Sequence, residues 1–230
     1  MKKNLLVLSA FFMVFIAQGQ KKSKEDIFSF IVNTSDTSSL KAIQSFSTNG
    51  HDLIALYWKI KKQAQEKGAN CFKLKKFTRD NSGEMNLTLD TYNGSDTFLM
   101  ANHYNHETST VYIISDGDFG NKTYTFNITG EKKIIKSGTY YKAILKPEEK
   151  LKINKGGAFG TTVILVWGEN KFCKFFTTSG FGLSDIPFGM NPAPTYNGGP
   201  GVGVSFSNGK LTPVDASIGF LMTKILTQQE

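Results

Sequence analysis

The feature that most limits the possible folds is a series of short apolar runs between residues 71 and 206. Each run holds four to eight residues, mostly β-branched or aromatic, and turn sequences such as "NGSD", "TGEKK" and "SNGK" separate them. Strands this short and this regularly interrupted favour an antiparallel sandwich or barrel over a parallel sheet. The expected strands are 71–78, 85–92, 97–103, 110–115, 122–129, 133–136, 139–145, 150–154, 161–167, 171–177 and 201–206.

One segment before this series has the period of a helix. In 52–67, apolar residues recur at spacings of three and four, Asp52 can cap the start, and Gly68 can end the helix. Residues 26–32 predict a strand with two apolar faces, and 40–46 fit either a short strand or a helical turn.

The rest of the chain completes an α+β, mainly β expectation. The Pro/Gly-rich stretch 186–203 predicts a long irregular connection, and 215–227 predicts either a closing helix or a last strand. We expect a small helix-containing α+β unit over 20–108, followed by an antiparallel β-sandwich over 109–230.

The first nineteen residues have the composition of a secretory signal peptide. A basic start is followed by an apolar run and by the small-residue end Ala17-Gln18-Gly19. No cysteine follows this end, which argues against a lipid anchor, and no later run reaches the roughly 18 apolar residues of a membrane helix. The sequence therefore predicts an exported protein, periplasmic or secreted, without a transmembrane segment after cleavage.

The charge of the chain narrows the class of partner. Two of the 27 basic residues lie in the signal segment, so the expected mature chain carries 25 basic against 19 acidic residues, a net charge of +6. Arg79 is the only arginine. Because arginine is the residue that pairs with phosphates and guanines in a bidentate manner, nucleic-acid binding is a poor interpretation. The positive charge is better explained by a need for solubility or by attraction to anionic envelope polymers.

Two stretches resemble known bacterial families. "LYWKIKKQAQEKGANCFKL" resembles the helix-Gly-Ala-Asn-strand unit of the Rcs stress-sensor lipoprotein and related putative metal-binding envelope domains. Residues 108–226 resemble exported β-sandwich domains of unknown function, with Val111, Tyr112, Gly130, Gly138, Thr139, Tyr140, Tyr141, Pro147, Val214, Asp215 and Gly219 in the order of that family. The turn of that family is usually Pro-Gly, whereas this chain has Pro147-Glu148. The resemblance implies a fold and a compartment but no reaction.

The two cysteines, Cys71 and Cys173, allow three roles. An even pair in an exported protein favours a disulfide, and this bridge would close a loop of about a hundred residues and contribute ~4 to 5 kcal/mol. Two buried free thiols are the structural alternative, and a reactive or metal-binding role is the third. Neither cysteine has a histidine close to it in sequence, so a Cys/His nucleophile has no local support.

The segment "HYNHE" contains candidate metal ligands. His103, His106 and Glu107 could hold zinc or copper if they lie on a turn, whereas on a strand the spacing of three places the two histidines on opposite faces. A third, distant ligand would be needed.

Other patterns do not reach a catalytic set. The glycine-rich stretch before Lys210 lacks the strand and helix of a phosphate-binding loop, and no Gly-x-Ser-x-Gly occurs. "SDGD" at 115–118 has too few ligands for a calcium loop. We find no cofactor motif. The sequence thus favours a non-catalytic interaction module that contacts another envelope protein or a cell-wall polymer, and the alternative is a metal- or redox-sensing domain that uses the cysteines and histidines.

Overall fold

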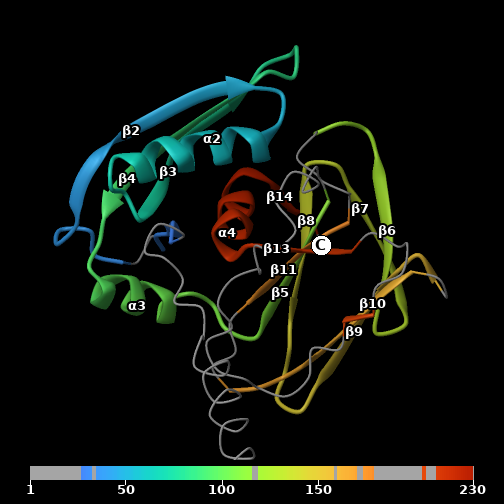
Figure 1. The fold of residues 1–230 in the computed structure, drawn as a ribbon. Coiled ribbons are helices and arrows are strands. Elements are labelled where there is room, and N and C mark those ends of the chain that lie inside the picture. The colour runs from blue at the N-terminus through green and yellow to red at the C-terminus, as the bar shows by residue number, and fades with distance from the viewer. Residues whose placement is uncertain are drawn as a thin grey trace, which may run out of the picture.

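The α+β, mainly β architecture is confirmed. The computed structural model describes residues 27–32, 35–115, 119–157, 160–169, 173–178, 204–205 and 211–229, in three helices and three sheets (Figure 1). The expected signal segment, residues 116–118 of "SDGD", the connection 186–203 and most of the glycine-rich stretch lie outside the described residues. None of the described helices is long and apolar enough to cross a bilayer.

The N-terminal sheet has the strand order β1-β3-β4-β2. Side chains alternate along β4 between buried residues such as Leu87 and Leu89 and a polar outer face, the pattern of a sheet with one covered side. The ambiguous segment 40–46 lies in β2. The strands are β1 (Ser29–Phe30), β2 (Lys41–Gly50), β3 (Cys71–Arg79) and β4 (Met85–Asn93).

Helix α2 (Leu53–Glu66) confirms the helix predicted over 52–67, and it packs on the covered face of this sheet. The Asp52 carboxylate accepts hydrogen bonds from the Ile54 and Ala55 N–H groups, at 2.8 and 3.1 Å, and so caps the first turn. Gly68 follows the helix with φ at +84°, a conformation that costs little only for glycine. Asn70 then holds the start of β3 to the end of β4 through the N–H and C=O groups of Gly94, at 2.8 and 2.7 Å.

The strand predicted over 97–103 is wrong, because this segment forms helix α3 (Asp96–Tyr104). The Ser95 hydroxyl accepts a hydrogen bond from the Phe98 N–H at 3.2 Å and caps the helix. Asn102 is buried, donates to the Phe30 C=O at 2.9 Å and accepts from the Val32 N–H at 3.0 Å. A helix places this amide where it completes the backbone hydrogen bonding beside β1, a tertiary demand that local alternation does not encode.

Two five-stranded sheets form a β-sandwich. Strands of the central sheet, in the order β13-β11-β5-β8-β14, are β5 (Thr110–Ile114), β8 (Thr139–Ile144), β11 (Lys174–Thr177), β13 (Thr212–Val214) and β14 (Thr227–Gln229). Strands of the distal sheet, in the order β12-β10-β9-β6-β7, are β6 (Thr123–Ile128), β7 (Glu131–Lys136), β9 (Lys150–Lys155), β10 (Thr161–Val166) and β12 (Val204–Ser205). Between the sheets lies a core made mainly of Val111, Ile113, Phe126, Ile128, Ile135, Leu151, Ile153, Val163, Leu165 and Phe176.

The sandwich differs in one respect from the antiparallel expectation. β11 pairs with β5, and β14 with β8, in parallel. Parallel partners need long connections, and here tens of residues separate the paired strands in the chain, including helix α4 before β14. The other described pairings within the two sandwich sheets are antiparallel.

Helix α4 (Ala216–Ile225) lies between the N-terminal sheet and the central sheet (Figure 1). The closing segment 215–227 is thus a helix, and β14 follows it. A second core, which we name the shared core, surrounds this helix and draws on both ends of the chain. Its buried members include Phe30, Phe46, Tyr57, Phe72, Leu87, Leu89, Tyr112, Ile114, Phe175, Ile218, Leu221 and Met222. Strand β5 is buried on both faces, because it borders both cores.

The turn after β8 contains the departure from the Pro-Gly pattern. The Glu149 N–H donates to the Lys146 C=O at 3.0 Å, and Glu148 has φ at +64°. Proline at the second position and a positive φ at the third describe a type II turn, which normally takes glycine there. Glu148 therefore holds a left-handed conformation that costs about 1 to 2 kcal/mol for a residue with a Cβ atom.

Gly219 allows α4 to approach the central sheet. A Cβ atom at this position would lie 2.2 to 2.6 Å from ring atoms of Phe175. We predict that Gly219→Ala lowers the free energy of unfolding, because forced overlap in a packed core costs about 1 to 3 kcal/mol and the better helix propensity of alanine returns about 1 kcal/mol at most. Thr223→Ala, on the same helix, serves as the control and should leave stability nearly unchanged. Urea unfolding of the two variants measures both values, and equal stability of Gly219→Ala and wild type would contradict the close approach.

Candidate functional site

The two cysteines are free, buried thiols in different surroundings. Cys71 begins β3, where its thiol donates to the Tyr92 C=O at 3.6 Å. Cys173 precedes β11 and belongs to the shared core. The disulfide considered from the sequence is therefore not formed. Burial raises the pKa of both thiols to about 12, which leaves them protonated at neutral pH and poor nucleophiles.

We predict that native protein reacts with a thiol reagent only after unfolding. Without reductant, alkylation followed by mass analysis should find no modified cysteine in the native chain and two modified cysteines in denaturant, because burial excludes both the reagent and the thiolate. Fewer than two alkylated thiols in denaturant, restored to two by reductant, would show that a disulfide exists.

The histidines lie at the end of α3, where this helix meets β1 and α4. The His106 Nε2 atom lies 3.3 Å from the Phe30 C=O, and its ring stacks on Phe220 with centroids 3.9 Å apart. His103 lies in the last turn of the helix. Among the residues that the structure describes, no group of three or more His, Cys, Asp or Glu side chains could hold a metal ion. The metal hypothesis at His103 and His106 thus gains no third ligand from this part of the chain.

Glu107 turns to a different pair of residues. Its carboxylate accepts hydrogen bonds from the Tyr112 hydroxyl and from Lys142 Nζ, each at 2.8 Å. Burial raises the pKa of Glu107, but the hydrogen bonds from Lys142 and Tyr112 outweigh this effect and hold the pKa below its ordinary value. Burial, followed by the Glu107 carboxylate, raises the pKa of the Tyr112 hydroxyl. Tyr112 is protonated, and the Glu107 carboxylate is paired with Lys142. The network therefore has a structural role and supplies neither a general base nor a nucleophile.

Burial of His106 makes stability depend on pH. It lowers the pKa of this imidazole from 6.5 to about 4, and the nearby His103 and Lys224 charges act in the same direction, while the Phe30 hydrogen bond and Glu107 oppose it. Burial also lowers the pKa of His103. The unfolded chain therefore binds more protons between pH 6.5 and 4, and stability falls as pH falls through this window.

We predict that His106→Gln removes most of this dependence. For the wild type, the stated pKa change corresponds to a loss of about 2 kcal/mol between pH 7 and 5. Glutamine keeps an N–H donor for the Phe30 C=O but does not titrate, so the variant should lose less over the same interval. His51→Gln, at an exposed position, is the control and should keep the wild-type profile. Parallel wild-type and His106→Gln profiles in urea unfolding would contradict the assignment.

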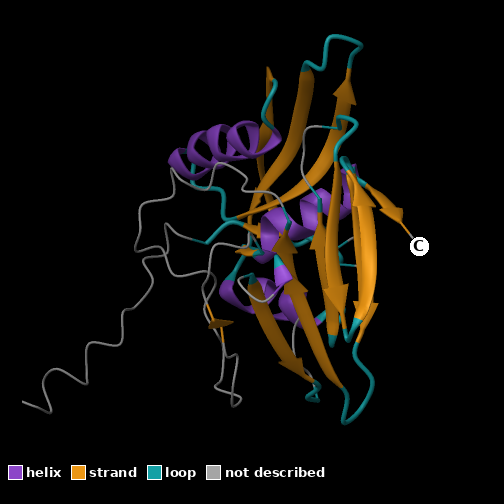
Figure 2. Cartoon of the chain, turned by 90° about the vertical axis from the view of Figure 1, so that its right-hand side faces the viewer, coloured by secondary structure: helices purple, strands orange, loops and turns teal. Residues whose placement is uncertain are grey.

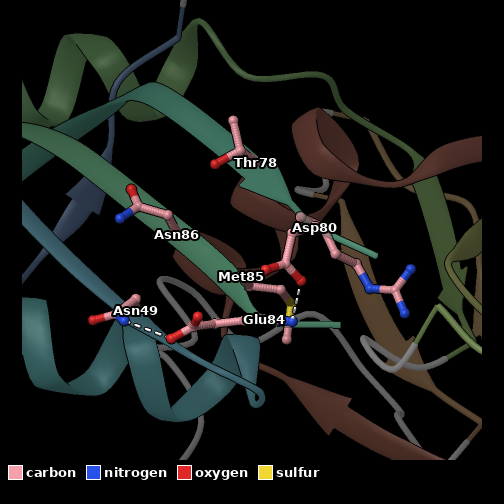
Figure 3. A pocket seen from close by; sticks show the side chains of 7 residues that line it. Asn49, Thr78, Asp80, Glu84, Met85 and Asn86 are labelled. Carbon is pink, nitrogen blue, oxygen red and sulfur yellow. Dashed lines mark hydrogen bonds between the residues drawn. The ribbon is translucent and has the colours of Figure 1, made fainter. Parts of the chain in front are cut away.

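A small polar hollow lies where β2 ends and the β3–β4 hairpin turns. It has a volume of about 230 Å³ and is lined by Asn49, Thr78, Arg79, Asp80, Glu84, Met85 and Asn86 (Figure 3). Its acidic groups already have partners. Asp80 accepts hydrogen bonds from the Ser82 N–H and hydroxyl and from the Glu84 N–H, at 2.6 to 2.9 Å, and the Glu84 carboxylate accepts one from Asn49 at 2.5 Å. The hollow is smaller than most small-molecule sites and holds no free acid–base pair, so it does not support catalysis.

A further candidate surface is the outward side of the distal sheet. Because Ile128, Ile153 and Val163 point into the sandwich, the alternate residues of each strand face outward. We name these twelve positions the lysine face: Thr123, Thr125, Asn127, Lys132, Ile134, Lys136, Lys150, Lys152, Asn154, Thr162, Ile164 and Val166. Figure 2 turns this side of the molecule toward the viewer.

The composition of the lysine face is one-sided. It carries four lysines and no carboxylate, together with three exposed aliphatic side chains, Ile134, Ile164 and Val166, which are 52%, 42% and 36% exposed. The register brings Lys152 opposite Ile164 and Lys150 opposite Val166. The closest acidic residue in these strands, Glu131, forms an ion pair with Lys133 at 2.9 Å. The face therefore presents positive charge and apolar surface side by side.

No family model, no curated protein and no solved structure matches the chain. The resemblances to exported β-sandwich domains and to helix-Gly-Ala-Asn-strand units stay predictions. The site is therefore argued from geometry and charge.

The sequence predicts the individual strands of the lysine face, but it does not predict that their outward sides form one surface. The alternating signals "KLKIN" and "TTVILV" show which residues share one side of each strand. They do not show that β9 and β10 lie beside β6 and β7 with all four apolar sides turned to the same core.

Proposed function

We propose that the protein is an exported, non-catalytic interaction module that binds an anionic envelope or cell-wall polymer through the lysine face. The observation that carries this proposal is the absence of any carboxylate among its twelve outward positions, four of which are lysines. A random surface of a chain with 19 acidic residues would mix both signs, so this face is suited to a partner of negative charge.

The geometry of the lysines suits a repeating polymer. Residues two apart on a strand lie roughly 7 Å apart and residues four apart roughly 13 Å, so Lys150 and Lys152 on β9 form a closer pair of charges and Lys132 and Lys136 on β7 a wider pair. The exposed aliphatic side chains beside these lysines, Ile134 on β7 and Ile164 and Val166 on β10, offer contact to the apolar faces of sugar rings. Lysine, a flexible point charge, suits a partner whose anionic groups do not have one fixed orientation.

The lack of an assembled catalytic set among the described residues supports binding over turnover. Both thiols are protonated, and Glu107 is paired with Lys142. In the polar hollow, Asp80 accepts hydrogen bonds from its own loop and Glu84 accepts one from Asn49 on β2. A panel of peptide, ester and glycan substrates should therefore show no turnover by purified protein. Turnover abolished by a point variant would sink the non-catalytic part of the proposal.

Binding to polyphosphate of defined length tests the surface. We predict that wild-type protein binds this probe with an affinity that falls steeply with salt, because the contacts are between exposed charges and phosphates. The variant Lys132→Gln, Lys136→Gln, Lys150→Gln and Lys152→Gln should bind at least tenfold more weakly at the same salt concentration.

A matched control separates the lysine face from net charge. Lys59→Gln, Lys62→Gln, Lys67→Gln and Lys76→Gln remove the same charge from exposed positions on or beside α2 and on β3. This variant should bind within about twofold of wild type. The two fourfold variants have equal net charge, and only the location of the removed lysines differs. Equal weakening by both variants would mean that net charge alone attracts the polymer, and the lysine face would then have no special role.

A further inference from the structure

Five of the six sheet edges in the described chain carry features that prevent pairing with another strand. β1 and β12 have two residues each, β14 has three, and β13 has three with Pro213 among them. β7 is longer, but three of its six residues are lysines. Short edges, proline and lysine are the means by which proteins keep open strands from associating.

β2 is the exception. It has ten residues, forms the outer edge of the N-terminal sheet in Figure 1, and has no charged residue and no proline between Ala42 and Gly50. Its register against β4 shifts between Ala42 and Gln44 and is regular from Gln44 to Gly50, so the bulge lies near one end of the uncharged stretch. Its main packing partners are β4 on one side and α2 over one face. Every second residue of an edge strand directs its N–H and C=O groups away from the neighbouring strand, so β2 offers a row of backbone donors and acceptors.

We propose that β2 is the interface of a homodimer, in which β2 of one copy pairs antiparallel with β2 of a second copy and joins two N-terminal sheets into one. The uncharged stretch 42–50 is centred on Phe46. An antiparallel pair of identical strands centred on this residue overlaps over that stretch alone and places no like charges opposite each other.

Side-chain parity agrees with this register, which the extent of the uncharged stretch selects. With the pair centred on Phe46, this residue lies opposite Phe46 of the second copy on the α2 side, and Ser45 lies opposite Ser47 of the second copy on the outer side. Ser45 and Ser47 are exposed, and their hydroxyls already donate within their own sheet, to Asp90 and to Asn86. Pairing of two copies therefore rests on the backbone groups of β2.

Two charges beside Ser45 are paired with each other. Lys75 Nζ lies 3.1 Å from the Asp90 carboxylate and 2.9 Å from the Ser45 hydroxyl, and Ser45 also bonds to Asp90. Each copy also brings the Glu84 carboxylate, which accepts a hydrogen bond from Asn49 at 2.5 Å. In a pair centred on Phe46, the two copies of Asn49 lie at opposite ends of the overlap, so the two Glu84 carboxylates are not opposite each other. The proposal does not depend on polymer binding, but a dimer would carry two lysine faces and gain avidity for a repeating ligand.

Sedimentation velocity over about 1 to 100 µM tests the proposal. Wild-type protein should form a concentration-dependent dimer in this range. Ser47→Lys adds a positive charge beside the two-fold axis and should weaken the dimer at least tenfold. Thr78→Lys places the same charge on the same outer face, on β3, which β4 separates from β2, and should leave the dimer within about twofold of wild type. Thermal unfolding confirms that both variants are folded.

Cross-linking tests the register independently. A mixture of Ser45→Cys and Ser47→Cys chains should form an inter-chain disulfide under mild oxidation, since opposite residues in an antiparallel pair lie about 4.5 to 5.5 Å apart, within disulfide range. Ser47→Cys alone should cross-link much more slowly, because the two copies of residue 47 are not opposite each other. If the wild-type chain stays monomeric throughout the range, the proposal is overturned, and the edge is left to a strand of another protein. If Ser47→Lys forms a dimer as tight as that of wild type, the proposal is also overturned.

Discussion

The packing of the shared core depends on the close approach of α4 to the central sheet. Gly219 lies against the Phe175 ring, and this contact lets a helix from the end of the chain sit between the N-terminal sheet and the sandwich. With a larger residue, the helix would move away from β11, and the shared core would lose its contact on one side. The sandwich has its own second core, so its two sheets do not depend on this helix in the same way.

This arrangement divides the faces of the chain by chemistry. The middle of the central sheet is buried on both sides, since β5 borders both cores and three of the four residues of β11 are buried. The outer strands β8, β13 and β14 are half-buried or exposed. The cysteines, His106 and the Glu107 network all lie at or near this interior, where burial keeps thiols protonated and imidazole neutral. Exposed lysines also lie on α2 and β3, but the outside of the distal sheet carries four lysines and no carboxylate, and the open uncharged edge belongs to β2. The two proposed surfaces therefore use the two outer sheets of the stack.

Local sequence signals predicted the elements better than their partners. α2 follows from apolar spacing, Asp52 and Gly68, and most strands follow from alternation between turn residues. The strand prediction for 97–103 failed because the buried Asn102 amide hydrogen-bonds to the backbone at β1, about seventy residues away in the chain. The parallel pairings of β11 and β14 were missed for the same reason, since alternation does not indicate which strand lies beside which. The candidate site was not predicted from the sequence. The cysteines and histidines were candidates because they are rare in the chain, whereas the lysine face consists of common residues that only the sheet order brings together.

Amide chemical-shift mapping during titration with polyphosphate is the most direct measurement of the central claim. If the lysine face binds the polymer, the shifts that saturate will belong to β7, β9 and β10, with the largest changes at and beside Lys132, Lys136, Lys150 and Lys152. If saturable shifts instead gather on α2 or the N-terminal sheet, or if no residue shows saturation, the distal sheet is not the binding surface and the proposed function is wrong.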